Sequence, residues 1–153
     1  MSSTSRIARS IIGLIVIVGL FAGMLPAAAQ DAAPAPKVVE YTLHTQLGGT
    51  PPMAYVGMGG DIDGVVNPTL TAHVGDTVRV TVVNSDGVLH SFVQDTFGAN
   101  TGQFSEKDSS VTVEFVVTQP GEFAYFCDVP GHREAGMTGQ LIVTGEVTVG
   151  DQS

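Results

Sequence analysis

The sequence predicts an all-β protein, an antiparallel β-sandwich of about seven to eight strands. Short segments rich in Val, Thr, Phe and Tyr recur along the chain, each bounded by Gly, Pro, Asn or Asp. This composition is typical of strands separated by turns. No stretch keeps a helical period over three turns. Many short strands with turns between them favour two packed sheets.

The first predicted strand is the most regular. From Lys37 to Leu47, apolar residues such as Val39, Tyr41 and Leu43 stand at every second position, which is the period of a half-buried strand. The stretch from Gly48 to Pro52 ends it. Further strands are predicted, for the same compositional reasons, at residues 69–73, 77–84, 90–95, 111–118, 122–127 and 139–144. The longest polar connection runs from Gly98 to Ser110.

The N-terminal segment has the three parts of an export signal. Arg6 and Arg9 precede an apolar run from Ile11 to Leu25, and Pro26-Ala-Ala-Ala29 follows with small residues. We expect residues 1–29 to be a signal peptide, 30–36 an Ala/Pro linker and 37–153 the folded domain. The uncharged run is also long enough for a retained N-terminal membrane anchor. The predicted location is therefore exported, periplasmic or extracytoplasmic, with membrane association only if the segment is uncleaved.

The charge of the chain excludes one class of partner. Without residues 1–29, four basic residues face fifteen acidic ones, a net charge of −11. Nucleic acid is not a plausible partner for such a protein. An acidic surface would steer the protein toward basic docking faces, or it serves solubility alone.

Four residues form a candidate metal site. The segment Cys127-Asp-Val-Pro-Gly-His132-Arg-Glu-Ala-Gly-Met137 places a thiolate, an imidazole and a thioether on one predicted loop, and His90 lies 37 residues before the only cysteine. Two histidines and a thiolate with a weak methionine sulfur are the ligands of mononuclear electron-transfer copper sites. Structural zinc sites are built from cysteine and histidine and do not include a thioether ligand. The metal ligands predicted are His90, Cys127, His132 and Met137, with one type 1 copper per chain.

The 127–137 segment resembles the copper-binding loop of the cupredoxins, the small blue copper proteins of plastocyanin/azurin type. Its Cys-x4-His-x4-Met spacing is most similar to that of rusticyanin, sulfocyanin and auracyanin. The resemblance extends over residues 63–78, 84–92 and 139–143. It implies a Greek-key cupredoxin fold, and His90, Cys127, His132 and Met137 match the family's four ligands. His44 and His73 have no such match, and we expect neither to be a ligand.

The resemblance also makes predictions about the surroundings of the sulfur. It implies that Ser91 donates a backbone N–H to the Cys127 sulfur. We predict a second such bond from the N–H of Val129, where plastocyanin-like loops have proline, and expect the two bonds to raise the potential. Asn84 either ties the His90 loop to the Cys127 loop or serves as a simple turn residue.

Met53 and Met58 are interpreted as packing or strand-end residues. An apolar rim around His132 is expected from Val88, Leu89, Phe97, Val129, Pro130 and Ala135.

The function predicted is electron transfer, not enzymatic catalysis. Four protein ligands leave no open position for a substrate, so the site suits a one-electron Cu(II)/Cu(I) shuttle. The expected partners are a redox protein donor and acceptor, cytochrome-like or a copper oxidoreductase, docking transiently near His132. Two alternatives stay open: an accessory copper domain working with a copper nitrite reductase or multicopper oxidase, and a copper-delivery protein. The first would need another chain, because four histidines cannot also supply a catalytic copper centre.

Overall fold

The computed structural model describes residues 35–147. The predicted signal or anchor at residues 1–29 and most of the predicted linker lie outside this range. Within it, no helix combines the length and the apolar character needed to cross a bilayer.

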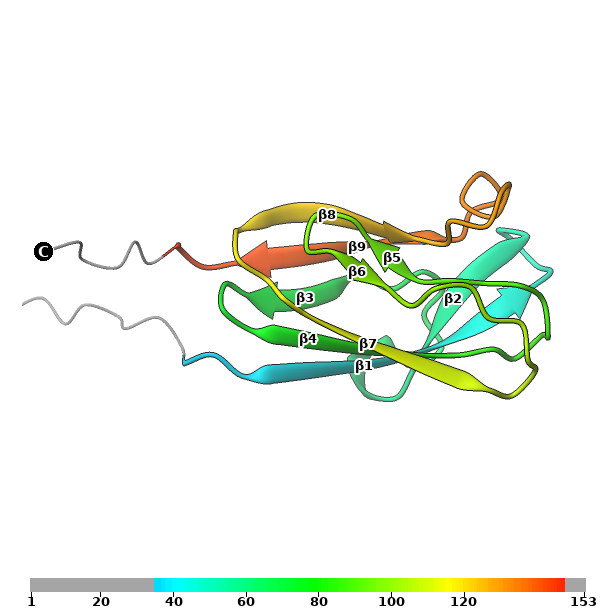
Figure 1. Ribbon diagram of the computed structural model, residues 1–153, viewed down its shortest axis with the longest axis horizontal. Helices are drawn as coiled ribbons and strands as arrows, with labels where there is room; N and C mark the ends of the chain where they lie inside the picture. Colours follow the sequence, from blue (N-terminus) through cyan, green and yellow to red (C-terminus); the bar gives the residue numbers. More distant parts are fainter. Residues whose placement is uncertain (1–34, 148–153) are drawn as a thin grey trace, which may run out of the picture. The chain divides into compact units, whose positions relative to one another are not determined.

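Nine strands form two sheets within the described residues (Figure 1). The first sheet contains, in spatial order, β2 (Met53–Met58), β1 (Val38–Leu47), β4 (Thr77–Val83) and β7 (Ser110–Val116). The second contains β3 (Leu70–His73), β9 (Thr138–Thr144), β8 (Gly121–Phe126), β5 (Val93–Gln94) and β6 (Ala99–Asn100). One short 3-10 helix, η1 (Gly60–Ile62), follows β2.

The predicted all-β sandwich is confirmed, but the sheets are mixed and not purely antiparallel. β1 pairs with β4 and β3 pairs with β9 in parallel, while the other strand pairs are antiparallel. A short turn can join only antiparallel neighbours. The strands of each parallel pair are instead linked through the other sheet, so the second strand enters in the same direction as the first. Strand composition carries no signal for such a crossing.

Two strands lie where the sequence predicts none. β2 has Gly57 within a glycine-rich stretch, yet it pairs with β1 from Leu47↔Met53 to Thr42↔Met58. Gly57 is required there because a Cβ would overlap the carbonyl of Ile62. Met53 and Met58 are therefore strand-end residues, as predicted. β6 falls inside the connection predicted as polar, whereas the strand predicted at residues 90–95 is limited to Val93–Gln94.

The core lies between the two sheets. Along β4 the buried side chains are Val78, Val80 and Val82, alternating with half-exposed neighbours. From the facing sheet, Tyr125 and Leu141 enter the same cluster. Full burial of such side chains stabilises the fold by about 1.5–3 kcal/mol each. The packed sheets give a rigid base for the loops at the end where β8 finishes (Figure 1).

Asp76 fastens the opposite end of the sandwich. Its carboxylate is 2% exposed and accepts the N–H of Lys37 on one oxygen and the N–H of His73 on the other, each at 3.0 Å. Burial opposes ionisation of Asp76, but these donors outweigh it and lower its pKa. One side chain thus joins the start of β1 to the β3–β4 turn.

We expect Asp76→Asn to lower the free energy of unfolding by about 1–3 kcal/mol, since the amide leaves one N–H donor without an acceptor. Because the folded pKa is lowered, the carboxylate stabilises the fold above its unfolded pKa of about 3.9 and loses this effect as pH falls through the folded value. In urea unfolding of the metal-free protein, the difference between wild type and variant should shrink below about pH 4. The exposed Asp61→Asn is the control; an equal loss there, or a pH-independent difference, would contradict this assignment.

Candidate metal centre

His90 is held by backbone pairing at the end of the 84–90 loop. Its N–H donates to the carbonyl of Phe104 at 2.9 Å, and the N–H of Phe104 donates back to the His90 carbonyl at 2.8 Å. Phe104 belongs to the long connection between β6 and β7, so this connection has a defined role. Its pairing with His90 fixes the position of the His90 backbone.

Asn84 organises the turn before His90. Its side-chain amide donates to the carbonyl of Val88 at 2.8 Å, and its side-chain oxygen accepts the N–H of Gly87 at 2.8 Å. None of its hydrogen bonds within the described residues reaches the 127–137 loop. Of the two roles left open for Asn84, the structure therefore shows the turn role.

The 127–137 loop closes on itself through its backbone. The N–H of Cys127 donates to the carbonyl of Met137 at 3.1 Å, and the N–H of Met137 donates to the carbonyl of His132 at 2.9 Å. A further bond runs from the N–H of His132 to the carbonyl of Val129 at 3.0 Å. These bonds set Cys127, His132 and Met137 on one compact turn between β8 and β9.

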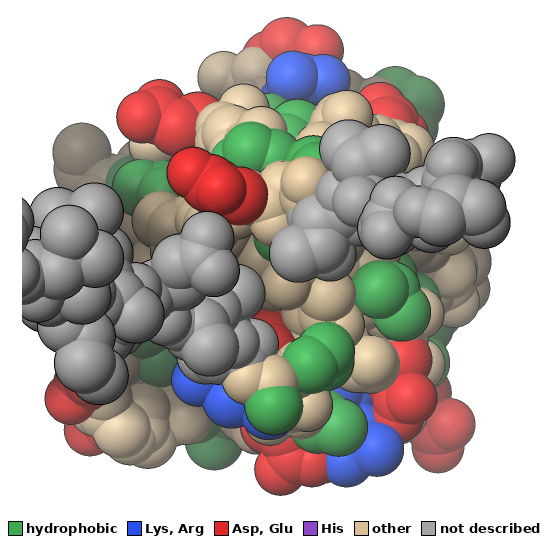
Figure 2. Space-filling view, turned by 90° about the vertical axis from the view of Figure 1, so that its left-hand side faces the viewer, with side chains coloured by type: hydrophobic (Ala, Val, Ile, Leu, Met, Phe, Trp, Pro, Cys, Tyr) green, Lys and Arg blue, Asp and Glu red, His purple; other side chains and the backbone are tan. Residues whose placement is uncertain are grey.

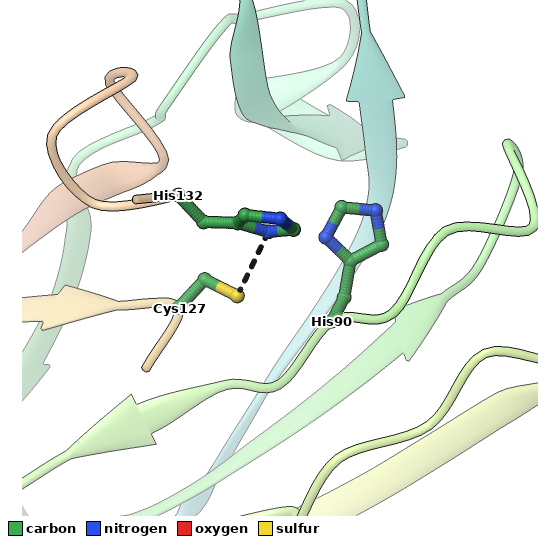
Figure 3. Close-up of side chains that lie close together, drawn as sticks. All are labelled: His90, Cys127 and His132. Atoms are coloured by element: carbon green, nitrogen blue, oxygen red, sulfur yellow. Dashed lines mark hydrogen bonds between the residues drawn. The ribbon is translucent and has the colours of Figure 1, made fainter. Parts of the chain in front are cut away.

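The structure brings the two loops together around the sulfur. A nitrogen of each imidazole and the Cys127 sulfur lie within 4.8 Å of one another. The sulfur is 3.5 Å from Nδ1 of His132, and the two imidazole rings meet edge to face with centroids 5.1 Å apart (Figure 3). Met137, the fourth predicted ligand, is fully buried in the adjoining core. Neither His44 nor His73 belongs to this group.

An unpartnered atom tests whether a metal fits here. Within residues 35–147, Nδ1 of His90 is the one buried side-chain nitrogen or oxygen without a hydrogen-bond partner. Such an atom normally costs free energy. A metal ion bound by the facing nitrogen and sulfur atoms would satisfy it. The donor set, two imidazoles and a thiolate with a thioether nearby, is the one that suits copper.

The surroundings favour the thiolate form of Cys127. Burial opposes ionisation, but contacts with His90, the backbone N–H of Val129 and both donors of Ser91 lower the thiol pKa. Burial lowers the pKa of His132, and the neighbouring His90 adds to this. A deprotonated sulfur and a neutral imidazole are the forms that bind metal.

Ser91 and Asp128 join the two loops. The Ser91 N–H donates to the Cys127 sulfur at 3.4 Å, as the resemblance implied. The second predicted bond, from the N–H of Val129, is not formed in the structure, but this N–H is near enough to the sulfur to lower the thiol pKa. In addition, the Ser91 hydroxyl donates to the Asp128 carboxylate at 2.6 Å and accepts the Asp128 N–H at 2.9 Å. Sequence reasoning missed this reciprocal pair, whose only signal is that each residue directly follows a predicted ligand.

Sequence reasoning also missed Asp86 and misplaced Phe97. The Asp86 carboxylate lies 3.0 Å from Nε2 of His90, and its position in an Asn-Ser-Asp-Gly turn was the only hint. Phe97, predicted in the apolar rim, instead stacks on Phe115 and meets Phe123 edge to face. It belongs to the core because β5 ends before it and turns it back between the sheets. Leu89 remains 39% exposed beside His90.

Comparisons with known proteins agree with this site. The family described as copper binding proteins, plastocyanin/azurin family, matches residues 57–144. Plastocyanin from Synechococcus sp. (strain JA-2-3B'a(2-13)) is 35% identical over 88 residues, 51% of this chain and 62% of that protein. The copper-resistant cuproprotein CopI from Rubrivivax gelatinosus is 28% identical over 93 residues, 49% of this chain and 56% of that protein. The chain thus spans less than two thirds of these relatives.

A solved structure supports the fold over a larger share of the chain than the sequence relatives do. Rusticyanin from Thiobacillus ferrooxidans aligns with 72% of this chain and 79% of its own, with a TM-score of 0.56 and 30% identity. The alignment therefore extends over most of the described residues.

Gly136 allows the return of the loop toward β9. It has φ +104°, and a Cβ there would overlap the ring of Pro51 in the β1–β2 turn. We expect Gly136→Ala to lower the free energy of unfolding by about 1–3 kcal/mol more than Gly131→Ala. Gly131 also has positive φ, at +85°, but a Cβ there meets open space. Urea unfolding of both variants checks this, and equal losses would show that backbone strain alone matters.

Proposed function

The chain belongs to the plastocyanin/azurin family of copper-binding proteins, and we propose that it is a blue copper protein carrying single electrons between extracytoplasmic redox partners. The observation that supports this proposal is the buried group of His90, Cys127 and His132 with its unpartnered His90 nitrogen. When bound, copper would supply the one-electron Cu(II)/Cu(I) couple.

The proposed ligands are His90 through Nδ1, the Cys127 sulfur, His132 and the Met137 thioether. His90 and Met137 are fully buried, Cys127 is 1% exposed and His132 is 8% exposed. This burial keeps water and substrates away from the ligands, so the residues favour electron transfer over bond-making chemistry. The backbone bonds that close both loops hold the ligands in place, which limits rearrangement between oxidation states.

Partner docking is proposed near His132, the most exposed of the four proposed ligands. Leu89, which directly precedes His90, is exposed, and Pro130 and Ala135 lie on the loop of His132. An apolar rim of this kind suits brief contacts with a redox donor and acceptor.

Figure 2 views the end where β1 begins and β9 ends, where acidic and basic side chains are mixed with small apolar groups. The site loops lie at the other end (Figure 1).

The proposed location is the periplasm or another extracytoplasmic space. It rests on the signal-like residues 1–29, and a retained segment would make the protein membrane-anchored. Copper delivery is a second candidate function, favoured by the likeness to a protein named as copper-resistant. An accessory role beside a copper oxidase or nitrite reductase has no comparable support.

The optical spectrum tests the proposed function. Protein loaded with Cu(II) should show an intense blue thiolate charge-transfer band that a reductant bleaches reversibly. Cys127→Ser should abolish the band, since the thiolate is its source, whereas His73→Gln should leave it unchanged. A colourless Cu(II) form of the wild type would reject electron transfer and favour delivery.

Val129 tests the control of the potential by the sulfur environment. Val129→Pro removes an N–H that favours the charged sulfur, so charge returns to the thiolate and Cu(II) is stabilised. A loss of about 1 kcal/mol, the scale of one hydrogen bond, corresponds to a decrease of roughly 40 mV in the midpoint potential. Val129→Ala, which keeps the N–H, is the matched control in cyclic voltammetry. A potential that rises in the proline variant, or falls equally in both, would refute this role.

A further inference from the structure

One of the two histidines carries a carboxylate partner. The Asp86 oxygens lie 3.0 and 3.2 Å from Nε2 of His90, and the carboxylate is only 13% exposed while the imidazole is fully buried. The Asp86 side chain is held in this orientation, because its Oδ1 also accepts the N–H of Val88 at 2.9 Å. The carboxylate is therefore anchored by the same turn that presents the ring.

This contact fixes the tautomer of His90. An ionised carboxylate can only accept hydrogen bonds, so Nε2 must carry the hydrogen of a neutral imidazole. The lone pair is then on Nδ1, which is the nitrogen without a partner and faces the sulfur and the second ring. Without the carboxylate, nothing in the contacts of His90 would prevent the hydrogen from residing on Nδ1, where it would block coordination.

The two histidines differ in this respect. Among the described residues, the ring of His132 makes its one hydrogen bond to the Cys127 sulfur and has no carboxylate partner. Of the two rings, only that of His90 is in direct contact with the Asp86 carboxylate; the charge reaches His132 only from a distance and raises the pKa of that ring slightly against the effect of burial. A charged acceptor makes the imidazole a stronger donor ligand, which favours the more highly charged metal ion.

We propose that Asp86 is a positioning residue that holds His90 ready to coordinate through Nδ1 and sets the potential low by stabilising Cu(II). This inference rests on the proposed electron-transfer function. A turn role alone does not explain the carboxylate, because an Asn side chain would accept the Val88 N–H equally well. What only the acid supplies is a full negative charge on the far side of a ligand.

Two variants separate charge from hydrogen bonding. Asp86→Asn keeps an oxygen acceptor for His90 and Val88 but removes the charge, and Asp86→Ala removes both. The matched control is Glu106→Gln, which removes one exposed charge from a segment whose next residue, Lys107, lies against Gly87 of the same turn. Each variant is loaded with copper and examined by voltammetry and by Cu(I) and Cu(II) competition titrations.

We expect Asp86→Asn to lower the ratio of Cu(II) to Cu(I) affinity about tenfold, which corresponds to a rise of about 59 mV in midpoint potential. Glu106→Gln should shift it much less. Equal shifts in the two variants, or no shift in Asp86→Asn, would overturn the proposal. A wild-type protein without the blue band would instead reject the proposed function, so the two failures are distinguishable.

The metal-free protein gives a second readout. Nitrogen-15 spectra of the imidazoles, recorded at alkaline pH so that both rings are neutral, should show His90 with its hydrogen on Nε2 in the wild type and in Asp86→Asn. In Asp86→Ala the two tautomers should both be populated. If the wild type carries the hydrogen on Nδ1, or if Asp86→Ala keeps the wild-type tautomer, Asp86 does not position His90. Should Asp86→Ala fail to fold, the wild-type tautomer and the Asp86→Asn potential still decide.

Discussion

A single constraint underlies this structure: one sulfur must be kept as a thiolate in a place that water hardly reaches. Burial alone would keep Cys127 protonated. Hydrogen-bond donors and imidazoles around the sulfur lower the thiol pKa, and they come from segments that are distant in the chain. The N–H of Ser91 contributes from one loop and that of Val129 from the other. Both loops must therefore meet at one end of the sandwich.

The sandwich makes this meeting possible. β8 delivers Cys127, β9 receives the chain after Met137, and β4 leads into the loop that ends at His90. Because the sheets pack through a continuous apolar core, the ends of these strands keep fixed positions. The turn before β2 completes the arrangement, since Pro51 lies against Gly136 of the ligand loop.

Around the four proposed ligands, two acidic side chains have different roles. Asp128 exchanges hydrogen bonds with the Ser91 hydroxyl and so joins the two loops. Asp86 faces a ring nitrogen and orients a ligand. His132 has neither kind of support from a carboxylate and is the ligand nearest to solvent. A carboxylate thus supports the site at His90, whereas the His132 ring, on the side proposed for docking, has none in contact.

The sequence alone determined the strand-rich fold and the four candidate ligands, because both depend on local signals: residue alternation, turn residues and the spacing of Cys127, His132 and Met137. It did not determine the parallel pairing of β1 with β4, the strand β2, or the core position of Phe97. These depend on which segments meet across the sheets. The roles of Asp86, Ser91 and Asp128 were likewise decided only by the tertiary structure, because a hydrogen bond between side chains requires a distance and a direction that residue order does not specify.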